Sequence, residues 1–433
     1  MKLFKKPIFV SISPNAQSDD VWLALRLLFS PWQWAHPHTT PGMGVNGDAA
    51  ARFTEEFKTY IGARHVFLFD SGRTSLYAIV KALDLKEDDE VLVQALTCTA
   101  AVNPILWVGA KPVYVDIEAE TYNMDPRDLL RKISPRSKAV IIQHTFGIPA
   151  NLDEILLIAK NHNLFVIEDV AHALGGEYRD KRLGTFGDAA VFSFGRYKII
   201  SSVFGGAAVV QNEKIAKRLS ELYDGLPFPS RFWIFEQLFH PVLLALVKPL
   251  YNIFSIGKAL VIIARKLKLI SLSVYTEEKQ GGRPGFGPSK MPNALAILGR
   301  NQFRKLEAFN RHREELAACY QKELRNIQGI TLPRAPTGSR PIFLNFPITL
   351  PDDSTALNLI GAGRREEGIY LENWPAKKVI GPRGTNLDKL MYVSGSCPVA
   401  ESVAPRVVTL PTNPNTTRED ALHVADLICH SLA

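Results

Sequence analysis

Seven short apolar runs between residues 65 and 211 constrain the fold of this chain more than any other feature of its sequence. They read HVFLFD, EVLVQ, PVYVD, KAVIIQ, LFVIE, AAVFSF and GAAVVQ. Runs this apolar, without a regular alternation of polar residues, are typical of strands that are covered on both faces. The stretches between them, such as TSLYAIVKAL and LDEILLIAKNH, have the apolar spacing of helices. The pattern therefore predicts an α/β fold with a doubly wound, mostly parallel, seven-stranded sheet.

The rest of the chain divides into segments of different character, and a length of 433 residues allows two or three domains. We expect an N-terminal segment (1–41), a large α/β domain (42–222), a basic apolar insert with a Gly-rich loop (223–287), and a small C-terminal α+β domain (288–433). In this last part, residues 291–324 have helical spacing. Thr416 stands three residues before Glu419, which is the spacing of a capping box at the start of a final helix.

The cysteine and charge patterns exclude several classes of protein. The four cysteines lie far apart with no C-x-x-C pair, which indicates neither a disulfide framework nor a metal cluster. The N-terminal stretch PIFVSISP is too short and too interrupted for a secretion signal, so we expect a cytoplasmic protein. The net charge is +8, and residues 231–272 contribute +5 of it, with six basic residues against Glu236. Because the remainder is nearly balanced, we expect no binding of nucleic acid.

A turn suited to an anion follows the first apolar run. HVFLFD leads into Ser71-Gly72-Arg73-Thr74-Ser75 and then into a helical stretch. A glycine turn at a helix N-terminus presents backbone N–H groups that can bind a phosphate. The same residues also suit an ordinary capped turn between a strand and a helix, so the turn alone does not decide between the two.

Reactive side chains follow two later runs. Asp169 comes directly after LFVIE, with His172 three residues further on, while AAVFSF contains Ser193 and leads to Lys198. In open α/β sheets the ligand lies beyond the carboxyl ends of the strands. We therefore expect an acid, a hydroxyl and an amine at the sheet edge that also carries the anion turn.

Together these stretches resemble the DegT/DnrJ/EryC1/StrS family of sugar aminotransferases, which are pyridoxal-phosphate enzymes of fold type I. The resemblance extends from about Gly42 to the C-terminus, and the order and spacing of its parts are more specific than any single part. The stretches that carry it are DSGRTSL, GAKPVYVDIEAETYNMDP, VIIQHTFGIPANLDEILLIAKNHNLFVIEDVAHALGGEY, GTFGDAAVFSFGRYK and LPTNPNTTREDALHVADLI. It implies pyridoxal 5'-phosphate (PLP) as the cofactor.

The resemblance assigns the catalytic roles to two residues. Lys198 would form a Schiff base with the cofactor aldehyde, as an amine whose lowered pKa makes it nucleophilic. Asp169 would pair with the protonated pyridine nitrogen, which keeps the ring able to accept electrons. The alternatives are a solvated lysine and an acid that only caps a turn.

The resemblance assigns cofactor binding to a second set of residues. Ser193 would hold the phosphate together with the backbone amides of Gly72, Arg73 and Thr74. His172 stands where the family usually has a glutamine that bonds the ring hydroxyl, and either imidazole nitrogen could make that bond. A core histidine bonded to the backbone is the alternative.

Four positions depart from the family pattern. Cys98 stands where an aromatic residue usually stacks on the cofactor ring, and Arg73 replaces a threonine in the phosphate turn. Phe204 interrupts the usual G-E-G-G after the lysine, and Pro288 lies near an asparagine that reaches the partner subunit's phosphate in relatives. The histidine of the relatives' sugar pocket is not recognisable around residues 368–375. These departures leave the catalytic residues in place, and what they call into question is the identity of the substrate.

The segment 231–272 combines aromatic, aliphatic and basic residues. Its longest uncharged run, residues 237–247, is 11 residues long, well short of the roughly 18–20 that span a bilayer. Pro241 and Pro249 are expected to divide it into short helical pieces. Two explanations stay open: packing on the dimer or over the mouth of the active site, which we favour, and a weak peripheral contact with an anionic membrane.

The resemblance implies an aminotransferase that moves an amino group from an amino acid, glutamate or glutamine, to a nucleotide-linked keto-sugar in polysaccharide or glycan precursor biosynthesis. It also implies a homodimer, with the loop Gly281 to Gly287 placed to reach the partner's site. A PLP sugar dehydratase is the nearest rival, but relatives that dehydrate have histidine in place of Lys198. A non-catalytic protein of the same fold, with a binding or regulatory role at a membrane surface, stays open because of Cys98 and Phe204.

Overall fold

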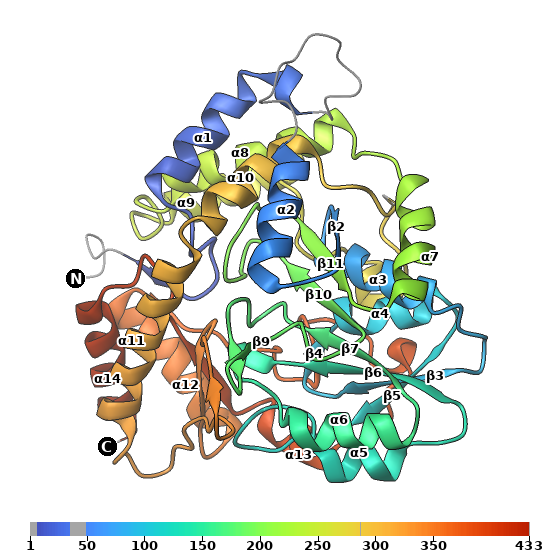
Figure 1. Ribbon diagram of the computed structural model, residues 1–433. Helices are drawn as coiled ribbons and strands as arrows, with labels where there is room; N and C mark the ends of the chain where they lie inside the picture. The colour runs from blue at the N-terminus through green and yellow to red at the C-terminus, as the bar shows by residue number, and fades with distance from the viewer. Residues whose placement is uncertain (1–6, 35–48, 286, 433) are drawn as a thin grey trace.

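A seven-stranded sheet forms the centre of the computed structural model, which describes residues 7–34, 49–285 and 287–432 (Figure 1). The strands lie in the order β2, β11, β10, β7, β6, β3, β5. Their bounds are His65–Phe69 (β2), Glu90–Gln94 (β3), Lys111–Val115 (β5), Ser137–Gln143 (β6), Phe165–Asp169 (β7), Ala189–Ser193 (β10) and Gly206–Val210 (β11). In this sheet β11 runs opposite to the other six strands, which all share one direction. The mostly parallel seven-stranded sheet predicted from the apolar runs is therefore confirmed.

Helices cover both faces of the sheet, as expected for strands without polar alternation. One face carries α1 (Ser18–Leu28), α2 (Ala49–Ile61), α6 (Leu152–Asn161), α8 (Arg231–Val247) and α10 (Asn293–Phe303). The other carries α3 (Gly72–Ala82), α4 (Thr99–Trp107), α7 (Glu213–Asp224) and α13 (Pro398–Val403). Within β3, Leu92 packs on the first face and Val91 and Val93 on the second. The fold is therefore doubly wound.

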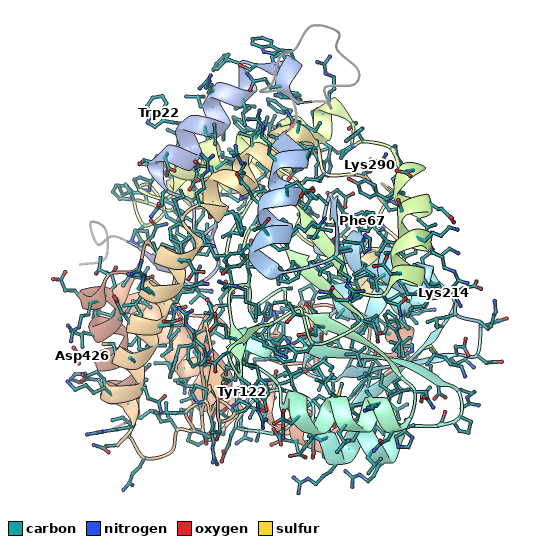
Figure 2. All side chains as sticks on the ribbon, in the orientation of Figure 1. Trp22, Phe67, Tyr122, Lys214, Lys290 and Asp426 are labelled. Atoms are coloured by element: carbon teal, nitrogen blue, oxygen red, sulfur yellow. The ribbon has the colours of Figure 1, made fainter. Side chains whose placement is uncertain are left out.

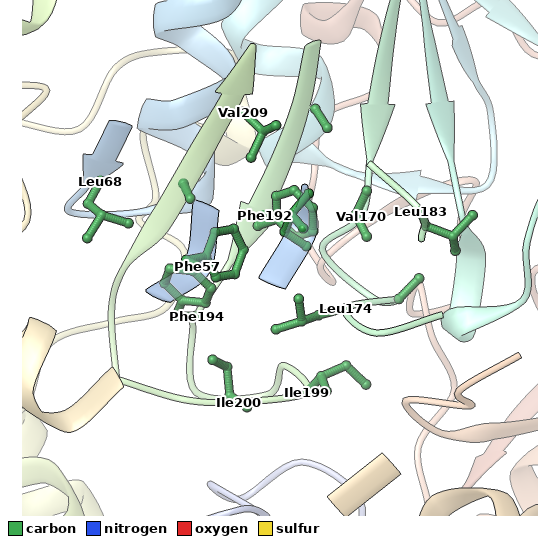
Figure 3. Packing of buried hydrophobic residues seen from close by; sticks show 14 of the residues in the cluster. Phe57, Leu68, Val170, Leu174, Leu183, Phe192, Phe194, Ile199, Ile200 and Val209 are labelled. Atoms are coloured by element: carbon green, nitrogen blue, oxygen red, sulfur yellow. The ribbon is translucent and has the colours of Figure 1, made fainter. Parts of the chain in front are cut away.

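Aromatic packing fixes the end of β10. Phe57 of α2 contacts Phe192 and Phe194, with ring centroids 5.1 and 5.5 Å apart (Figure 3). Because side chains alternate along a strand, Ser193 then faces the opposite side, toward α3. Ile199 lies in the same apolar cluster as the three rings. Apolar packing thus holds the chain on both sides of Lys198.

A second, smaller core lies in the C-terminal part. The antiparallel strands β13 (Phe346–Thr349) and β16 (Val407–Leu410) are covered by α11 (Leu306–Leu324), α12 (Asp353–Ala362) and α14 (Arg418–Leu432). Ile8 and Val10, near the N-terminus, pack into this core. Their strand β1 (Ile8–Phe9) pairs with β14 (Ile369–Tyr370). The predicted boundary between 41 and 42 lies outside the described residues, and the division into domains stays a prediction.

The final helix begins one residue later than the predicted capping box. Thr417 accepts a hydrogen bond from the Asp420 N–H through Oγ1 (3.1 Å), and its own N–H donates to the Asp420 carboxylate (2.9 Å). The prediction of Thr416 and Glu419 was therefore wrong. The N–H of Thr416 instead donates to the Asn413 carbonyl (3.0 Å), so it is not available to a capping carboxylate.

The insert forms two helices rather than several short pieces. α8 continues through Pro241 to Val247, and α9 (Ile256–Lys266) follows after Pro249. The expectation that Pro241 would break the helix was wrong. Pro241 is buried, and α8 packs along α1, so tertiary packing outweighs the one hydrogen bond that proline removes. Among the described residues, no helix has the length and apolar character needed to cross a bilayer.

Candidate active site

Seven of the eight predicted site residues line one cavity at the carboxyl ends of β7 and β10. The cavity measures about 60 Å³. The predicted residues on its wall are Gly72, Arg73, Cys98, Asp169, His172, Ser193 and Lys198. Six of these, all except Asp169, also line a larger adjoining cavity of about 420 Å³, where Phe204 is among the further lining residues.

The N-terminus of α3 forms a narrow cup against the ends of β10 and β11. A Cβ added to Gly72 would lie 2.8 Å from Ser193 Cβ, and one added to Gly206 would lie 2.4 Å from the Gly72 nitrogen. Only glycine allows this close approach of three chain segments. The first-turn amides of Gly72 and Arg73 have no acceptor inside the helix, so they are available to an anion.

Thr74 lies behind this cup rather than on its wall. Its N–H donates to Ser71 Oγ (3.3 Å), the N-cap of α3, and its hydroxyl bonds the same atom (3.0 Å). The Thr74 amide thus makes a capping bond, and its contact with a phosphate stays a prediction. Thr74 supports the turn that Gly72 and Arg73 form.

Lys198 lies on the loop between β10 and β11 and is held from behind by the N-terminal segment. Asn15 donates through Nδ2 to the carbonyl oxygens of Lys198 and Ile199, the latter at 2.9 Å. The fully buried Arg313 donates through Nη2 to Asn15 Oδ1 (2.7 Å). Burial lowers the pKa of Lys198, which increases the fraction of neutral, nucleophilic amine.

Asp169 and His172 line the cavity with defined hydrogen bonds. Asp169 Oδ1 accepts from the Ala171 N–H (3.0 Å), and burial raises the pKa of Asp169. His172 Nδ1 accepts from the Phe146 N–H (3.3 Å), so its proton is on Nε2. Burial lowers the pKa of His172 well below its usual value, which keeps the ring neutral. Of the two nitrogens left open by the sequence, Nε2 is the one free to donate.

Arg73 is paired with a residue that sequence reasoning did not find. Its guanidinium forms a buried ion pair with Glu278 and donates to the Ser273 carbonyl. It also lies over the ring of Phe204, 5.9 Å from the centroid, and Arg196 lies over the same ring at 5.2 Å. Two of the departures from the family pattern, Arg73 and Phe204, are therefore in contact.

Gln143 is a further residue of the cavity, and it was not among the residues predicted from the sequence. It is the last residue of β6, accepts from Thr97 Oγ1 (2.6 Å) through Oε1, and donates through Nε2 to Thr145 Oγ1 (2.9 Å). Its place at the end of a predicted strand is a signal in the sequence that could have identified it as a site residue. Cys98 closes the same wall, and burial raises the pKa of its thiol, which stays protonated.

This combination of fold and site defines a PLP-dependent aminotransferase. Residues 38–225 and 253–429 match the model of the DegT/DnrJ/EryC1/StrS aminotransferase family, and the chain belongs to that family. The family, the fold class and the aminotransferase activity predicted from the motifs are confirmed. Residues 226–252, which contain the whole of α8, fall between the matched parts.

Similar proteins cover most of the chain. An uncharacterised protein of Methanocaldococcus jannaschii is 30% identical over 88% of this chain and 89% of its own. GDP-perosamine synthase of Escherichia coli O157:H7 is 26% identical over 88% of this chain and 90% of its own. The fold matches that of NtdA from Bacillus subtilis, solved with its cofactor PMP, with a TM-score of 0.73 and 21% identity over 100% of this chain and 87% of that one.

The residues of the cavity fit PLP. The glycine cup suits a phosphate, because an added Cβ would fill it. The buried Asp169 carboxylate suits a protonated ring nitrogen, since burial disfavours a bare charge there. Lys198 supplies an amine of lowered pKa on the same wall.

The close approach of Gly206 to α3 predicts a loss of cofactor affinity in Gly206→Ala. The added methyl group must push the α3 N-terminus away, and strain of about 1–3 kcal/mol corresponds to roughly fivefold to 150-fold weaker PLP binding. A spectrophotometric titration with PLP measures the change. Gly225→Ala at the end of α7 is the control, because its Cβ would come no closer than 3.7 Å to the atoms around it. Equal affinities of the two variants would contradict the assignment of the cup.

Proposed function

We propose that this aminotransferase moves an amino group from an amino acid, glutamate or glutamine, to a nucleotide-linked keto-sugar in polysaccharide or glycan precursor biosynthesis. The larger cavity beside Lys198, of about 420 Å³, supports this proposal. Its wall combines the aromatic ring of Trp374 with the polar groups of Asn345 and Glu372. A sugar presents both apolar faces and hydroxyl groups, and such a wall can contact both. The activity named for GDP-perosamine synthase supports the same substrate class.

The proposed chemistry divides between two residues on the cavity wall. Bound PLP supplies an electron sink for the amino-bearing carbon of the substrate. Lys198 would attach the cofactor aldehyde covalently through Nζ, with release of water, and, once freed again, would carry the proton to and from the substrate carbon. Asp169 would keep a proton on the ring nitrogen. The position of Lys198 on the wall that it shares with Asp169 carries this proposal.

Cofactor binding is proposed for the remaining residues. Ser193 Oγ and the amides of Gly72 and Arg73 hold the phosphate, and Thr74 supports them through Ser71. His172 donates from Nε2 to the ring oxygen, and Cys98 lies beside the ring in place of a stacked aromatic side chain. None of these contacts requires a metal ion.

Lys198→Ala is expected to abolish both covalent attachment of the cofactor and transamination, because the amine that attaches it is removed. Borohydride reduction followed by intact-mass measurement tests attachment, and an assay over a panel of keto-sugar nucleotides tests turnover. Lys160→Ala, on the exposed side of α6, is the control. Full transamination by Lys198→Ala would exclude this role.

Asp169→Asn is expected to leave PLP bound and to slow turnover by orders of magnitude. A neutral amide cannot hold the ring nitrogen protonated, whereas its oxygen can still accept the bond from the Ala171 N–H. The substitution therefore separates the electrostatic role from a structural one. Single-turnover kinetics measure the rate, and a rate equal to that of the native enzyme would show that Asp169 only stabilises the turn.

We propose that the enzyme is a homodimer with its sites near the interface. The position of the loop Gly281 to Gly287 beside the cup supports this, since Pro288 and Gly287 line a cavity of about 80 Å³ together with Arg73. Light scattering is expected to give about twice the chain mass of 48.1 kDa. A fully active species of single-chain mass would refute the dimer.

Two further properties belong to the same proposal. A cytoplasmic location is supported by the four unpaired cysteines, which suit a reducing compartment. A weak peripheral contact of residues 231–272 with membranes is supported by the +5 charge of that segment.

A further inference from the structure

Three helices meet at one corner of the molecule, far from α5 (Pro126–Lys132) and α6. Figure 1 shows α1, α8 and α9 grouped there. α1 and α8 lie antiparallel: Arg231 at the start of α8 donates through Nη2 to the Pro31 carbonyl (3.2 Å), and His240 Nε2 bonds Ser13 Oγ before α1 (2.9 Å). The outward sides of the helices therefore form one continuous part of the surface.

α8 is apolar on its outward side as well as on its buried side. Phe232 and Leu246 are 55% and 65% exposed, and they lie fourteen residues apart, on the same side of the helix. Phe235 stacks on Phe232 and on Phe239, with ring centroids 6.3 and 5.6 Å apart. A row of half-buried aromatic side chains thus continues along α8 from the exposed Phe232.

The neighbouring helices extend this apolar surface. On α1, Trp22 and Phe29 are 69% and 77% exposed, and Figure 2 shows Trp22 at the outer edge of the molecule. At α9, Phe254 is 80% exposed, and Ile262, Ile263 and Leu267 are more than half exposed. Soluble proteins rarely leave large apolar side chains grouped in this way unless the surface binds something.

Basic residues accompany the apolar ones. Five exposed cations lie on or beside these helices: Arg26, Arg231, Arg265, Lys266 and Lys268. Within the described part of the chain, none of the five forms an ion pair. The acidic residues of the helices are less available, because Asp19 and Asp20 both bond Lys305 and Glu236 is partly buried. The surface is therefore both apolar and positively charged.

We propose that α1, α8 and α9 form a docking surface for an anionic lipid bilayer, on which the helices lie flat. This inference rests on the peripheral contact proposed above and adds α1, with its tryptophan, to the surface. Helices that bind in the plane of a bilayer carry Trp, Phe and Leu beside Lys and Arg in this way. A second copy of the chain fits the same surface less well, since two-fold pairing would place like charges against each other.

Co-sedimentation of the PLP-loaded full chain with vesicles tests the proposal. The vesicles are phosphatidylcholine alone or phosphatidylcholine mixed with phosphatidylglycerol, at low and at high salt. We expect binding to the anionic vesicles that high salt weakens. Arg265→Gln/Lys266→Gln/Lys268→Gln should weaken binding about fivefold for each charge, or about a hundredfold in all. Ile262→Ser/Ile263→Ser/Leu267→Ser should lose binding although its charge is unchanged.

Leu130→Ser/Leu157→Ser on α5 and α6 is the matched control, because both side chains are more than half exposed on other helices. It should bind vesicles as the native chain does. All three variants should keep transamination in solution, so a failure of the docking proposal is distinguishable from a failure of the enzymatic one.

Three results would overturn the docking surface. The first is no binding of the native chain to anionic vesicles, and the second is equal binding by the serine variant on α9. The third is salt-resistant binding to neutral vesicles, which would remove the role of the charges. If the native chain does not bind vesicles, and the serine variant has a lower mass in solution than the native chain, then the surface binds a second copy of the chain.

Discussion

The shared direction of β6, β7 and β10 is the constraint on which the active site depends. Their register pairs Gln143 with Asp169, and Asp169 with Val191, two residues before Ser193. Parallel neighbours therefore bring an amide, an acid and a hydroxyl to one sheet edge. The antiparallel β11 then places Gly206 opposite Ser193 and against the N-terminus of α3. A slip of one residue in any of these strands would turn its side chain to the other face.

The parts of the structure that follow from local patterns could be predicted from the sequence. The strands are buried on both faces, so each appears as an apolar run, and the residues that end the runs meet because of the topology. Asp169 and Ser193 were found in this way, and Gln143 could have been. The pair of Arg73 and Glu278 could not, because the two residues are 205 positions apart and no local pattern joins them. The contact of Asn15 with the Lys198 loop could not be predicted for the same reason, because the two segments lie far apart in the sequence.

Two errors show how tertiary contacts decide between equivalent local signals. Thr416 and Thr417 both stand three residues before an acid, and the bond of the Thr416 N–H to Asn413 leaves the cap to Thr417. Pro241 is a helix breaker in isolation, yet α8 continues through it because the helix is buried along one side. In both cases the helix was predicted from the sequence, and tertiary contacts determine at which residue it begins or whether it continues.

The insert and the departures from the family pattern are parts of one arrangement. The inner side of the insert bonds Arg196, through Gln237 Oε1 (3.2 Å) and the carbonyl and hydroxyl of Ser271 (2.8 and 2.6 Å). Arg196 in turn lies over Phe204, as Arg73 does from the cup.

A carboxylate beside Arg73 compensates its buried charge, and removing one partner of such a pair is strongly destabilising. Glu278, which follows the basic segment 231–272 and precedes the Gly-rich loop, supplies that carboxylate. Arg73 and Phe204 therefore connect the cup to the insert and leave Lys198 and Asp169 in place. The same insert that presents an apolar, basic surface outward thus forms part of the support of the active site inward.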